Sequence, residues 1–312
     1  MAVVIEIVVL DDFDRVFERS PRLDPLRQMG RLTVYTQPAP SETALIERLE
    51  HADVVIANRE RTAFGRGLLS RLPRLRLIAQ TGHGVAHIDL AAAEEFGVAV
   101  RTTHGASVSS VVELAFGLML ACLRALPLHD RRLRQGVWRP EPGRELGGKR
   151  LGILGLGEIG SALVPVARAF GMEAVAWGRR ASLDRARQLG IPGYADLDEL
   201  LSLADIVTVH LRLTPETRGL LDARRLALLK PGAVLVNTSR GPTVDESALV
   251  AALREGRLAA GLDVFDTEPL PPRHPLLDLD NVVLSPHIGW VTHDTYERFI
   301  VGCVENVREF LA

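Results

Sequence analysis

Several sequence features that can by themselves assign a protein to a structural class are scarce or missing in this chain. Among its 312 residues there are two cysteines, Cys122 and Cys303, far apart and each inside an apolar helical pattern. So few cysteines provide no disulfide framework, and their setting predicts buried thiols in a reducing compartment. No internal repeat or low-complexity tract is present, which argues against a solenoid or a disordered chain.

An excess of one charge is also missing, and so is a long apolar run. The formal net charge of −2 and the pI of about 6.5 provide no electrostatic case for a nucleic-acid partner. The longest uncharged apolar stretch, Leu114–Leu123, is shorter than the roughly 20 residues of a membrane span. The apolar start, Met1–Leu10, lacks a basic segment and carries Glu6, so it predicts a strand rather than a signal peptide. We expect a cytoplasmic protein that binds neither membranes nor nucleic acids.

Apolar residues are abundant, at 47%, and the length suits two domains of roughly 150 residues each. Short β-rich runs alternate with helical patterns, which is typical of a parallel sheet with crossover helices. In the first third the expected strands are Val3–Leu10, Leu32–Tyr35, Asp53–Ala57, Leu75–Gln80 and Val98–Arg101. The expected helices there are Ser41–Glu50 and Leu90–Phe96.

A long helix is expected at Ser107–Ala125. Its apolar residues cover nearly the whole circumference, which predicts burial on several sides, between domains or subunits. After a polar stretch rich in Pro and Gly, a second series of strands is expected at Arg150–Leu154, Glu173–Trp177, Ile206–Leu211, Ala233–Asn237, Ala259–Val264 and Val282–Leu284. Six such strands suit a complete dinucleotide-binding domain. The amphipathic segment Thr292–Ala312 is expected to return to the first domain.

Glycines are spaced as in a phosphate-binding turn directly after the first strand of the second series. Gly155 allows the tight turn, Gly157 lets a pyrophosphate approach the backbone, and Gly160 lets helix and strand pack closely. Glu158 and Ile159 open the helix, whose N-terminus attracts phosphate. A bare G-x-G-x-x-G is weak evidence, but here a strand precedes it and a helix and second strand follow.

The end of the second strand bears on the choice of cofactor. An acidic residue there would bind the ribose 2′-hydroxyl of NAD, and a basic residue would accept the 2′-phosphate of NADP. The chain has Gly178 followed by Arg179 and Arg180. Two guanidinium groups can pair with a phosphate, although both could simply be solvated. We therefore expect NADP(H) to be favoured over NAD(H).

Three chemically versatile side chains follow three strands of the second series. Arg240 follows Ala233–Asn237, Glu268 follows Ala259–Val264, and His287 follows Val282–Leu284. Because ligands bind at the carboxyl ends of parallel strands, we expect all three at one edge of the sheet. Each alone could be a turn residue or a surface charge. Their joint placement indicates a site.

These residue types suit the reduction of a 2-keto acid. The planar fork of Arg240 can hold a carboxylate and polarise the keto oxygen. His287 can give a proton while a nicotinamide gives a hydride. Glu268, hydrogen-bonded to His287, would fix the tautomer of the imidazole.

The sequence resembles the D-isomer-specific 2-hydroxyacid dehydrogenase family, which includes phosphoglycerate dehydrogenases and glyoxylate/hydroxypyruvate reductases. The resemblance runs from about Leu75 onward and is weaker before it. The matching segments are 147–160, 214–217, 229–232, 237–241, 261–265 with 268–269, and 285–287. The chain departs from the family pattern at His87 and Ser107, which leaves the substrate open.

By that resemblance Arg240, Glu268 and His287 fall on the catalytic arginine, glutamate and histidine of the family. Asp263 falls near the nicotinamide amide. The other expected cofactor contacts outside the glycine turn and the arginine pair are His210, Thr217, Thr238 and Ser239. A loop with exposed backbone amides, expected to hold the substrate carboxylate together with Arg240, comprises Gly82, His83, Gly84 and Val85.

The resemblance implies an α/β fold in which a Rossmann dinucleotide-binding domain is inserted in a smaller, flavodoxin-like substrate domain. The expected boundaries are 101–285 for the former, and 1–100 with 286–312 for the latter. It also implies a homodimer paired through the helix near 107–125. We expect no metal site. The expected activity is hydride transfer between NAD(P)H and a small 2-keto or D-2-hydroxy acid.

The alternatives are a dinucleotide-sensing regulator and an L-type lactate or malate dehydrogenase. Some relatives of this fold are dinucleotide-sensing regulators resembling corepressors, which usually carry extra interaction tails, and no disordered arm is evident here. L-type lactate or malate dehydrogenases have their glycine fingerprint near the N-terminus. Here it begins at Gly155, behind a whole α/β unit, which argues against that class.

Overall fold

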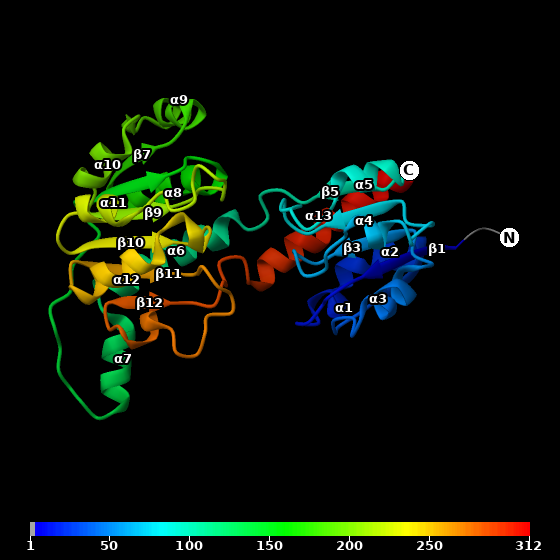
Figure 1. The fold of residues 1–312 in the computed structure, drawn as a ribbon, viewed down its shortest axis with the longest axis horizontal. Helices are drawn as coiled ribbons and strands as arrows, with labels where there is room; N and C mark the ends of the chain where they lie inside the picture. Colours follow the sequence, from blue (N-terminus) through cyan, green and yellow to red (C-terminus); the bar gives the residue numbers. More distant parts are fainter. Residues whose placement is uncertain (1–3) are drawn as a thin grey trace. The chain divides into compact units, whose positions relative to one another are not determined.

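The computed structural model describes residues 4–312. These form two compact units (Figure 1): residues 4–107 with Val291–Ala312 make the first, and Val108–Trp290 the second. The boundaries therefore lie a few residues beyond those expected at 100/101 and 285/286. The reason is local: the second unit begins with its long helix at Val108, and the turn after its last strand runs to Trp290.

The first unit contains a five-stranded parallel sheet in the order β2-β1-β3-β4-β5. Its strands are β1 (Ile5–Val9), β2 (Gly30–Val34), β3 (Val54–Ala57), β4 (Leu77–Gln80) and β5 (Ala99–Thr102). Every described pairing is parallel. The order 2-1-3-4-5 is that of flavodoxin-like folds, as the family resemblance implies.

Helices connect these strands and cover the sheet. They are α1 (Val16–Arg19), α2 (Asp24–Met29), α3 (Glu42–Leu49), α4 (Arg66–Leu69) and α5 (Leu90–Glu95), with a 3₁₀ turn η1 (Pro21–Leu23). The C-terminal helix α13 (His293–Leu311) lies beside β4 and β5 (Figure 1). Its apolar residues recur at helical spacing, and Phe299, Ile300, Cys303 and Val307 are buried. That buried face attaches the end of the chain to the first unit.

The second unit contains a parallel sheet of seven strands in the order β12-β11-β10-β9-β6-β7-β8. They are β6 (Arg150–Leu154), β7 (Glu173–Trp177), β8 (Gly193–Tyr194), β9 (Ile206–Val209), β10 (Ala233–Asn237), β11 (Leu258–Leu262) and β12 (Val282–Leu284). The expected six strands are all present. The seventh, β8, is a two-residue edge strand beside β7, too short to produce a periodic pattern.

Helices pack on both faces of this sheet. They are α6 (Val108–Leu123), α7 (Leu126–Arg134), α8 (Glu158–Ala169), α9 (Arg180–Leu189), α10 (Leu197–Leu203), α11 (Ala223–Leu228) and α12 (Glu246–Arg254), with 3₁₀ turns η2 (Gly241–Thr243) and η3 (Pro275–Asp278). Successive strand residues serve opposite faces. Ile153 packs with α6 and α8, whereas Leu154 packs with α10, α11 and α12.

Helix α6 is less enclosed within one chain than its apolar pattern predicts. Ala115 and Met119 are fully buried, but Glu113 and Gly117 are exposed. The side of α6 that carries Glu113 and Gly117 is therefore left exposed. Among residues 4–312 no single helix has the length and hydropathy to cross a bilayer, and only α6 and α7 taken together, with a 62° bend between them, meet that test by length and composition.

Candidate active site

Three neighbouring strands bring the three expected catalytic side chains to one edge of the second sheet. Strands β10, β11 and β12 lie side by side and run parallel. Arg240, Glu268 and His287 each lie in the segment that follows one of these strands. The joint placement expected from the sequence is therefore present in the fold.

His287 and Glu268 form a direct pair. The Nδ1 atom of His287 lies 2.7 Å from Oε2 of Glu268, and each side chain is 36% exposed. Because a carboxylate can only accept, Nδ1 carries the proton, and Nε2 faces away from the glutamate. The second oxygen of Glu268, Oε1, accepts from the backbone N–H of Phe265 at 3.0 Å. The glutamate is thus fixed by its own loop and orients the imidazole.

The turn that carries His287 is held by Asp263, a carboxylate that is 1% exposed. Its Oδ1 accepts from the hydroxyl of Ser285 at 2.6 Å and from Ile288 N–H at 2.8 Å, and Oδ2 accepts from Gly289 N–H at 2.8 Å. His287 itself has a φ of 55°, a left-handed conformation that costs a non-glycine residue about 1–3 kcal/mol. The bonds from Asp263 on both sides of His287 stabilise that conformation.

Arg240 combines a fixed backbone with an exposed side chain. Its carbonyl accepts from Nδ2 of Asn237 at 2.9 Å and from the hydroxyl of Thr243, both of which are buried. The guanidinium donates to the carbonyl of Ser239 at 2.7 Å and is otherwise exposed. Such a fork of donors at a fixed position suits a carboxylate ligand.

Gly241 explains how the arginine and glutamate loops come so close. A Cβ at this residue would lie 2.0 Å from the carbonyl carbon of Phe265, so only glycine fits. The sequence motif contains this glycine, but nothing local indicates which backbone it meets. Asn237 and Gly241 are therefore site-forming residues whose roles the sequence did not reveal.

The glycine turn after β6 fits a dinucleotide pyrophosphate. A Cβ at Gly155 would lie 2.6 Å from the carbonyl oxygen of His210, and one at Gly160 would lie 2.1 Å from that of Gly155. At Gly157, in contrast, no atom of the described residues lies within 4 Å of such a Cβ. Two glycines thus permit close packing, and the third leaves open space in front of the N-terminus of α8. Gly157 is the N-cap of that helix and provides no capping side chain, so the first N–H groups, at Glu158 and Ile159, suit phosphate oxygens.

Two buried polar atoms at the ends of β9 and β10 have no hydrogen-bond partner among residues 4–312. They are Nδ1 of His210 and the hydroxyl of Thr238, both at expected cofactor positions after β9 and β10. Buried polar groups are nearly always hydrogen-bonded, so these atoms favour a ligand. Burial lowers the pKa of His210 to about 3, so the ring is neutral, and its Nε2 bonds the hydroxyl of Thr208 at 2.8 Å.

The other expected cofactor residues serve the neighbouring loops. The hydroxyl of Thr217 donates to the Arg212 carbonyl at 2.7 Å and accepts from Thr214 N–H at 2.8 Å, which closes the loop after β9. Ser239 donates through both its N–H and its hydroxyl to Oδ1 of Asn237, each at 3.0 Å. Both residues therefore shape the loops beside the turn.

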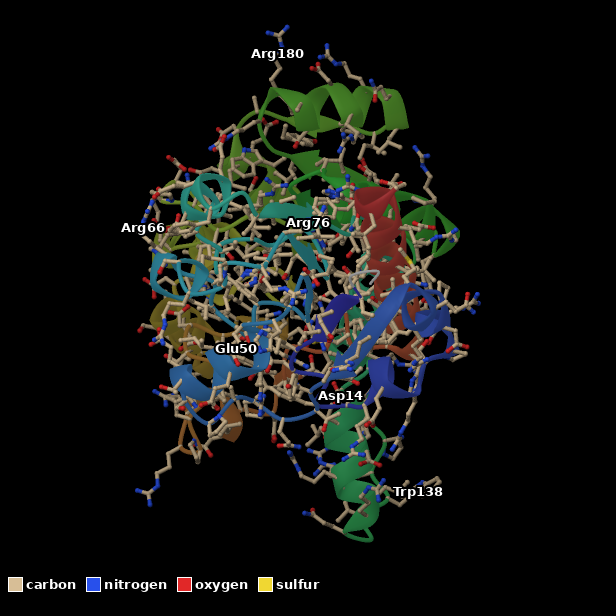
Figure 2. All side chains as sticks on the ribbon, turned by 90° about the vertical axis from the view of Figure 1, so that its right-hand side faces the viewer. Asp14, Glu50, Arg66, Arg76, Trp138 and Arg180 are labelled. Atoms are coloured by element: carbon tan, nitrogen blue, oxygen red, sulfur yellow. The ribbon has the colours of Figure 1, made fainter. Side chains whose placement is uncertain are left out.

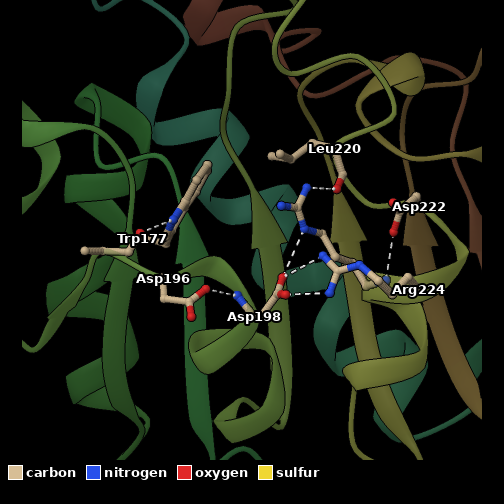
Figure 3. A network of polar contacts seen from close by, with 8 residues as sticks. Trp177, Asp196, Asp198, Leu220, Asp222 and Arg224 are labelled. Carbon is tan, nitrogen blue, oxygen red and sulfur yellow. Dashed lines mark hydrogen bonds and ion pairs between the residues drawn. The ribbon is translucent and has the colours of Figure 1, made fainter.

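A polar network fixes the end of β7 (Figure 3). Nε1 of Trp177 donates to the Ala195 carbonyl at 3.2 Å. Asp198, at the start of α10, accepts from both Arg224 and Arg225 of α11, which lowers the pKa of its carboxyl. These bonds tie β7, α10 and α11 together next to Gly178.

The two arginines that follow Gly178 differ in direction. Nη2 of Arg179 lies 3.8 Å from Oε2 of Glu216, and both side chains of this ion pair are exposed. Arg180 extends from the start of α9 into solvent (Figure 2). Among the described residues, neither guanidinium forms an ion pair with a buried carboxylate. Both side chains can therefore rearrange toward an anion.

The expected substrate loop lies in the first unit, after β4. The N–H of Gly82 donates to the hydroxyl of Thr103 at 2.6 Å. A Cβ at Gly84 would lie 2.1 Å from Oε1 of Glu60, which places the Glu60 carboxylate against the loop. His83 is exposed and stacks on His104, and Val85 is partly buried. The expected contact of the amides of residues 82–85 with an anion stays a prediction.

One comparison decides the family. The model described as "D-isomer specific 2-hydroxyacid dehydrogenase, NAD binding domain" matches residues 116–289, which is more than half of the chain. The chain belongs to the D-isomer specific 2-hydroxyacid dehydrogenase family. The match falls within the second unit, which is therefore the NAD-binding Rossmann domain of the family.

Named relatives in the family differ in length and in reaction. The D-3-phosphoglycerate dehydrogenase of Methanocaldococcus jannaschii is 38% identical over 289 residues, which are 92% of this chain and 54% of that protein. The chain thus spans about half the length of that relative. The glyoxylate reductase of Aeropyrum pernix is 41% identical over 284 residues, 88% of this chain and 84% of that protein. A crystal structure of a phosphoglycerate oxidoreductase from Vibrio cholerae superposes with a TM-score of 0.85 at 38% identity, covering 98% of this chain and 99% of that one.

Proposed function

We propose that the protein is an oxidoreductase that interconverts a small 2-keto acid and the corresponding D-2-hydroxy acid with NAD(P)H. The observation that carries the proposal is the 2.7 Å bond between His287 and Glu268 at the strand end beside Arg240. Family membership and the fit of the glycine turn to a dinucleotide support it.

In this proposal His287 is the general acid. Bound NAD(P)H supplies the hydride that adds to the keto carbon. His287 donates the proton of Nε2 to the keto oxygen, which becomes the hydroxyl, and the reverse reaction returns that proton to the ring. Glu268 keeps the proton of Nδ1 in place and so presents Nε2 to the substrate.

Arg240 is proposed to bind the substrate carboxylate and to polarise the keto oxygen. Its exposed guanidinium and fixed backbone suit both tasks. The loop of residues 82–85 in the first unit is proposed to supply further amides to the carboxylate. Asp263, because both its oxygens hold the turn of His287, is proposed to fix that turn as well as to lie near the nicotinamide.

NADP(H) is proposed as the favoured cofactor. Position 178 has no acidic side chain, and Arg179 and Arg180 follow it. Replacing both arginines with alanine should weaken NADPH binding by about 10-fold or more, since each charge-assisted hydrogen bond to phosphate contributes about 1.5–3 kcal/mol. NADH binding should change little. Equal losses for the two cofactors would remove the support for a 2′-phosphate site.

A homodimer through α6 is proposed as the working assembly. Glu113 and Gly117 on α6 are exposed, and the following segment exposes apolar side chains, with Leu133 at 56% and Trp138 at 84%. Figure 2 shows Trp138 at the surface. Large exposed apolar residues favour a protein partner. Light scattering of the purified protein should give a dimer mass, and the substitution Gly117→Arg should give a monomer. The expected cytoplasmic location stays a prediction, which localisation of a tagged chain tests.

The proposed activity is tested by following NADPH and NADH oxidation with glyoxylate, hydroxypyruvate, pyruvate and phenylpyruvate. We expect turnover with at least one acid, faster with NADPH, and its loss in His287→Ala. Tight cofactor binding without turnover on any acid would instead favour a dinucleotide-sensing role.

A further inference from the structure

Helix α9 is bonded to the phosphate turn by two side chains that no sequence motif singled out. The guanidinium of Arg185 donates through Nη1 to the carbonyl of Leu156 at 2.9 Å. The hydroxyl of Ser182 accepts from the N–H of the same leucine at 3.4 Å. Leu156 lies between Gly155 and Gly157, so both of its backbone groups bond to α9 at the centre of the turn.

Ser182 also faces the position that distinguishes NAD from NADP. A Cβ built on Gly178 would lie 2.5 Å from Oγ and 2.6 Å from Cβ of Ser182. A change of rotamer moves Oγ but not Cβ, so any side chain at position 178 requires α9 to shift. Such a short approach to a helical Cβ is not tolerated in packed proteins. Ser182 therefore keeps position 178 free of the acidic side chain that a ribose 2′-hydroxyl would need.

Arg185 brings a positive charge to the same place. Residues 182 and 185 are three apart on a helix and so share one face. One Nη1 donor of Arg185 is used by the Leu156 carbonyl, which leaves further donors of the guanidinium for an anion. By contrast, Arg187, on the same helix, forms an ion pair with Asp184.

We propose that Ser182 and Arg185 are specificity residues of the cofactor site. Ser182 excludes an acidic side chain at position 178, and Arg185, anchored on Leu156, joins Arg179 in binding the 2′-phosphate of the adenine ribose. The group that these side chains would recognise is a phosphate monoester on a ribose, and it would lie next to the glycine turn of the protein. The inference rests on the proposed use of a nicotinamide dinucleotide, and it names residues beyond the Arg179–Arg180 pair.

The first test measures equilibrium binding by titration calorimetry, with NADPH, NADH, adenosine 2′,5′-bisphosphate and 5′-AMP as ligands. Arg185→Ala should weaken NADPH and the bisphosphate by about 10- to 100-fold, the range of one charge-assisted hydrogen bond, and change NADH and 5′-AMP less than about threefold. Arg187→Ala is the matched control, because it removes the same charge from the same helix. It should change all four ligands less than about threefold. Arg185→Lys, which keeps the charge, should recover part of the NADPH affinity.

An equal loss of all four ligands in Arg185→Ala would show that the arginine only supports the turn, and would overturn the proposal for that residue. Arg179→Ala separates this failure from that of the proposed cofactor preference. If wild type binds NADH at least as tightly as NADPH and Arg179→Ala loses nothing selectively, the preference itself is wrong. If Arg179→Ala is selective and Arg185→Ala is not, only the present inference fails.

The second test examines the contact between Ser182 and Gly178. Gly178→Asp alone should weaken both dinucleotides, because the aspartate displaces α9. The double variant Gly178→Asp with Ser182→Gly should bind NADH at least about tenfold more tightly than NADPH, since the space is then free and the carboxylate repels phosphate. If the single variant prefers NADH as strongly as the double variant, Ser182 does not control which side chain position 178 can accept. Circular dichroism and a thermal melt show whether each variant folds. If Gly178→Asp does not fold, the comparison is made instead between Gly178→Ala alone and Gly178→Ala combined with Ser182→Gly.

Discussion

At the scale of single residues, the proposed chemistry depends on a histidine whose position is stabilised from two sides. Glu268 orients the ring of His287 through Nδ1. Asp263 accepts from the Ser285 hydroxyl before it and from the backbone N–H groups of Ile288 and Gly289 after it. The left-handed φ of His287 persists because these bonds stabilise it. A side chain so fixed keeps Nε2 in one direction and loses little freedom when a substrate binds.

His287→Ala is expected to lower the turnover of the best keto acid by about 10²- to 10⁴-fold, the usual contribution of a general acid. Cofactor affinity should stay close to that of wild type. Glu268→Gln is the companion variant and should lower turnover less, because the amide oxygen can still accept from Nδ1. Steady-state kinetics and cofactor titration measure both effects. Near-normal turnover in His287→Ala would exclude the histidine from the reaction.

Arg240→Lys tests the role assigned to the guanidinium. A lysine keeps the charge but lacks the planar fork that binds a carboxylate through two parallel bonds. We expect the KM for the keto acid to rise by about 10-fold or more, as for the loss of one charge-assisted hydrogen bond. The Kd for NADPH should not change. A variant that retains wild-type KM would show that the carboxylate binds elsewhere.

At the scale of elements, the loops after β9, β10, β11 and β12 form the site because each is fixed by a few specific bonds. Gly241 permits the loops after β10 and β11 to touch, and Asp263, just after β11, holds the turn after β12. The loop after β9 carries His210, whose carbonyl lies against Gly155 and whose ring is buried. The phosphate turn and the catalytic loops are thus joined through consecutive strands of one sheet.

Burial of His210 predicts a pH dependence of stability. Its folded pKa is lowered from the ordinary 6.5 to about 3, so below pH 6.5 the unfolded chain binds a proton that the folded chain does not. The free energy of unfolding should therefore fall as pH drops from 6.5 toward 3, by at most about 1.4 kcal/mol per pH unit from this group. Denaturant unfolding of the apoprotein between pH 4 and 7 measures the slope.

His210→Gln should make that slope shallower, since glutamine does not titrate. The comparison uses the slopes rather than the absolute stabilities, because the substitution also changes packing. Thr208→Val is a useful control, as it removes the hydroxyl that bonds the ring but leaves the histidine. Identical slopes in wild type and His210→Gln would show that the ring is protonated in the folded protein.

The elements themselves were largely predictable from the sequence. Strands β6, β7, β10 and β12 lie where the alternation of apolar runs and turn glycines predicts them, because a buried parallel strand needs a continuous apolar run. The missed strand β8 consists of two residues at a sheet edge and has no run of its own. The short helices α1 and α4 were not predicted either, since four residues contain barely one helical period.

At the scale of the whole molecule, each unit contains one cysteine, Cys303 in the first and Cys122 in the second. Burial raises the pKa of each thiol to about 12. Only about one thiol in 10⁴ is therefore ionised at pH 8, and the thiolate is the form that reacts. The two cysteines can thus report the folding of the two units separately.

We expect neither thiol to react rapidly with a disulfide reagent in the native protein at pH 8, and both to react in guanidinium chloride. Cys122→Ser leaves a probe of the first unit, and Cys303→Ser leaves a probe of the second. Labelling across a denaturant series shows whether the two units unfold at the same concentration. Rapid labelling of the native Cys122→Ser variant would contradict the burial of Cys303.

The sequence by itself determined the α/β class, the phosphate turn and the three side chains at the strand ends. These features depend on local patterns: the spacing of apolar residues, glycines within a turn, and a polar residue just after an apolar run. Each pattern acts over a few neighbouring residues, so one chain is enough to display it.

Only the tertiary structure decided which groups meet. Asp263 holds Gly289, Gly241 meets Phe265, Thr103 occupies the Gly82 amide, and Arg185 reaches Leu156. In each pair the partners lie on different loops or elements, separated by about 20 residues or more of intervening chain. No local period encodes such contacts, because they depend on how strands order themselves in a sheet and how closely the backbones then approach. The specificity proposed for the cofactor site comes from contacts of this kind.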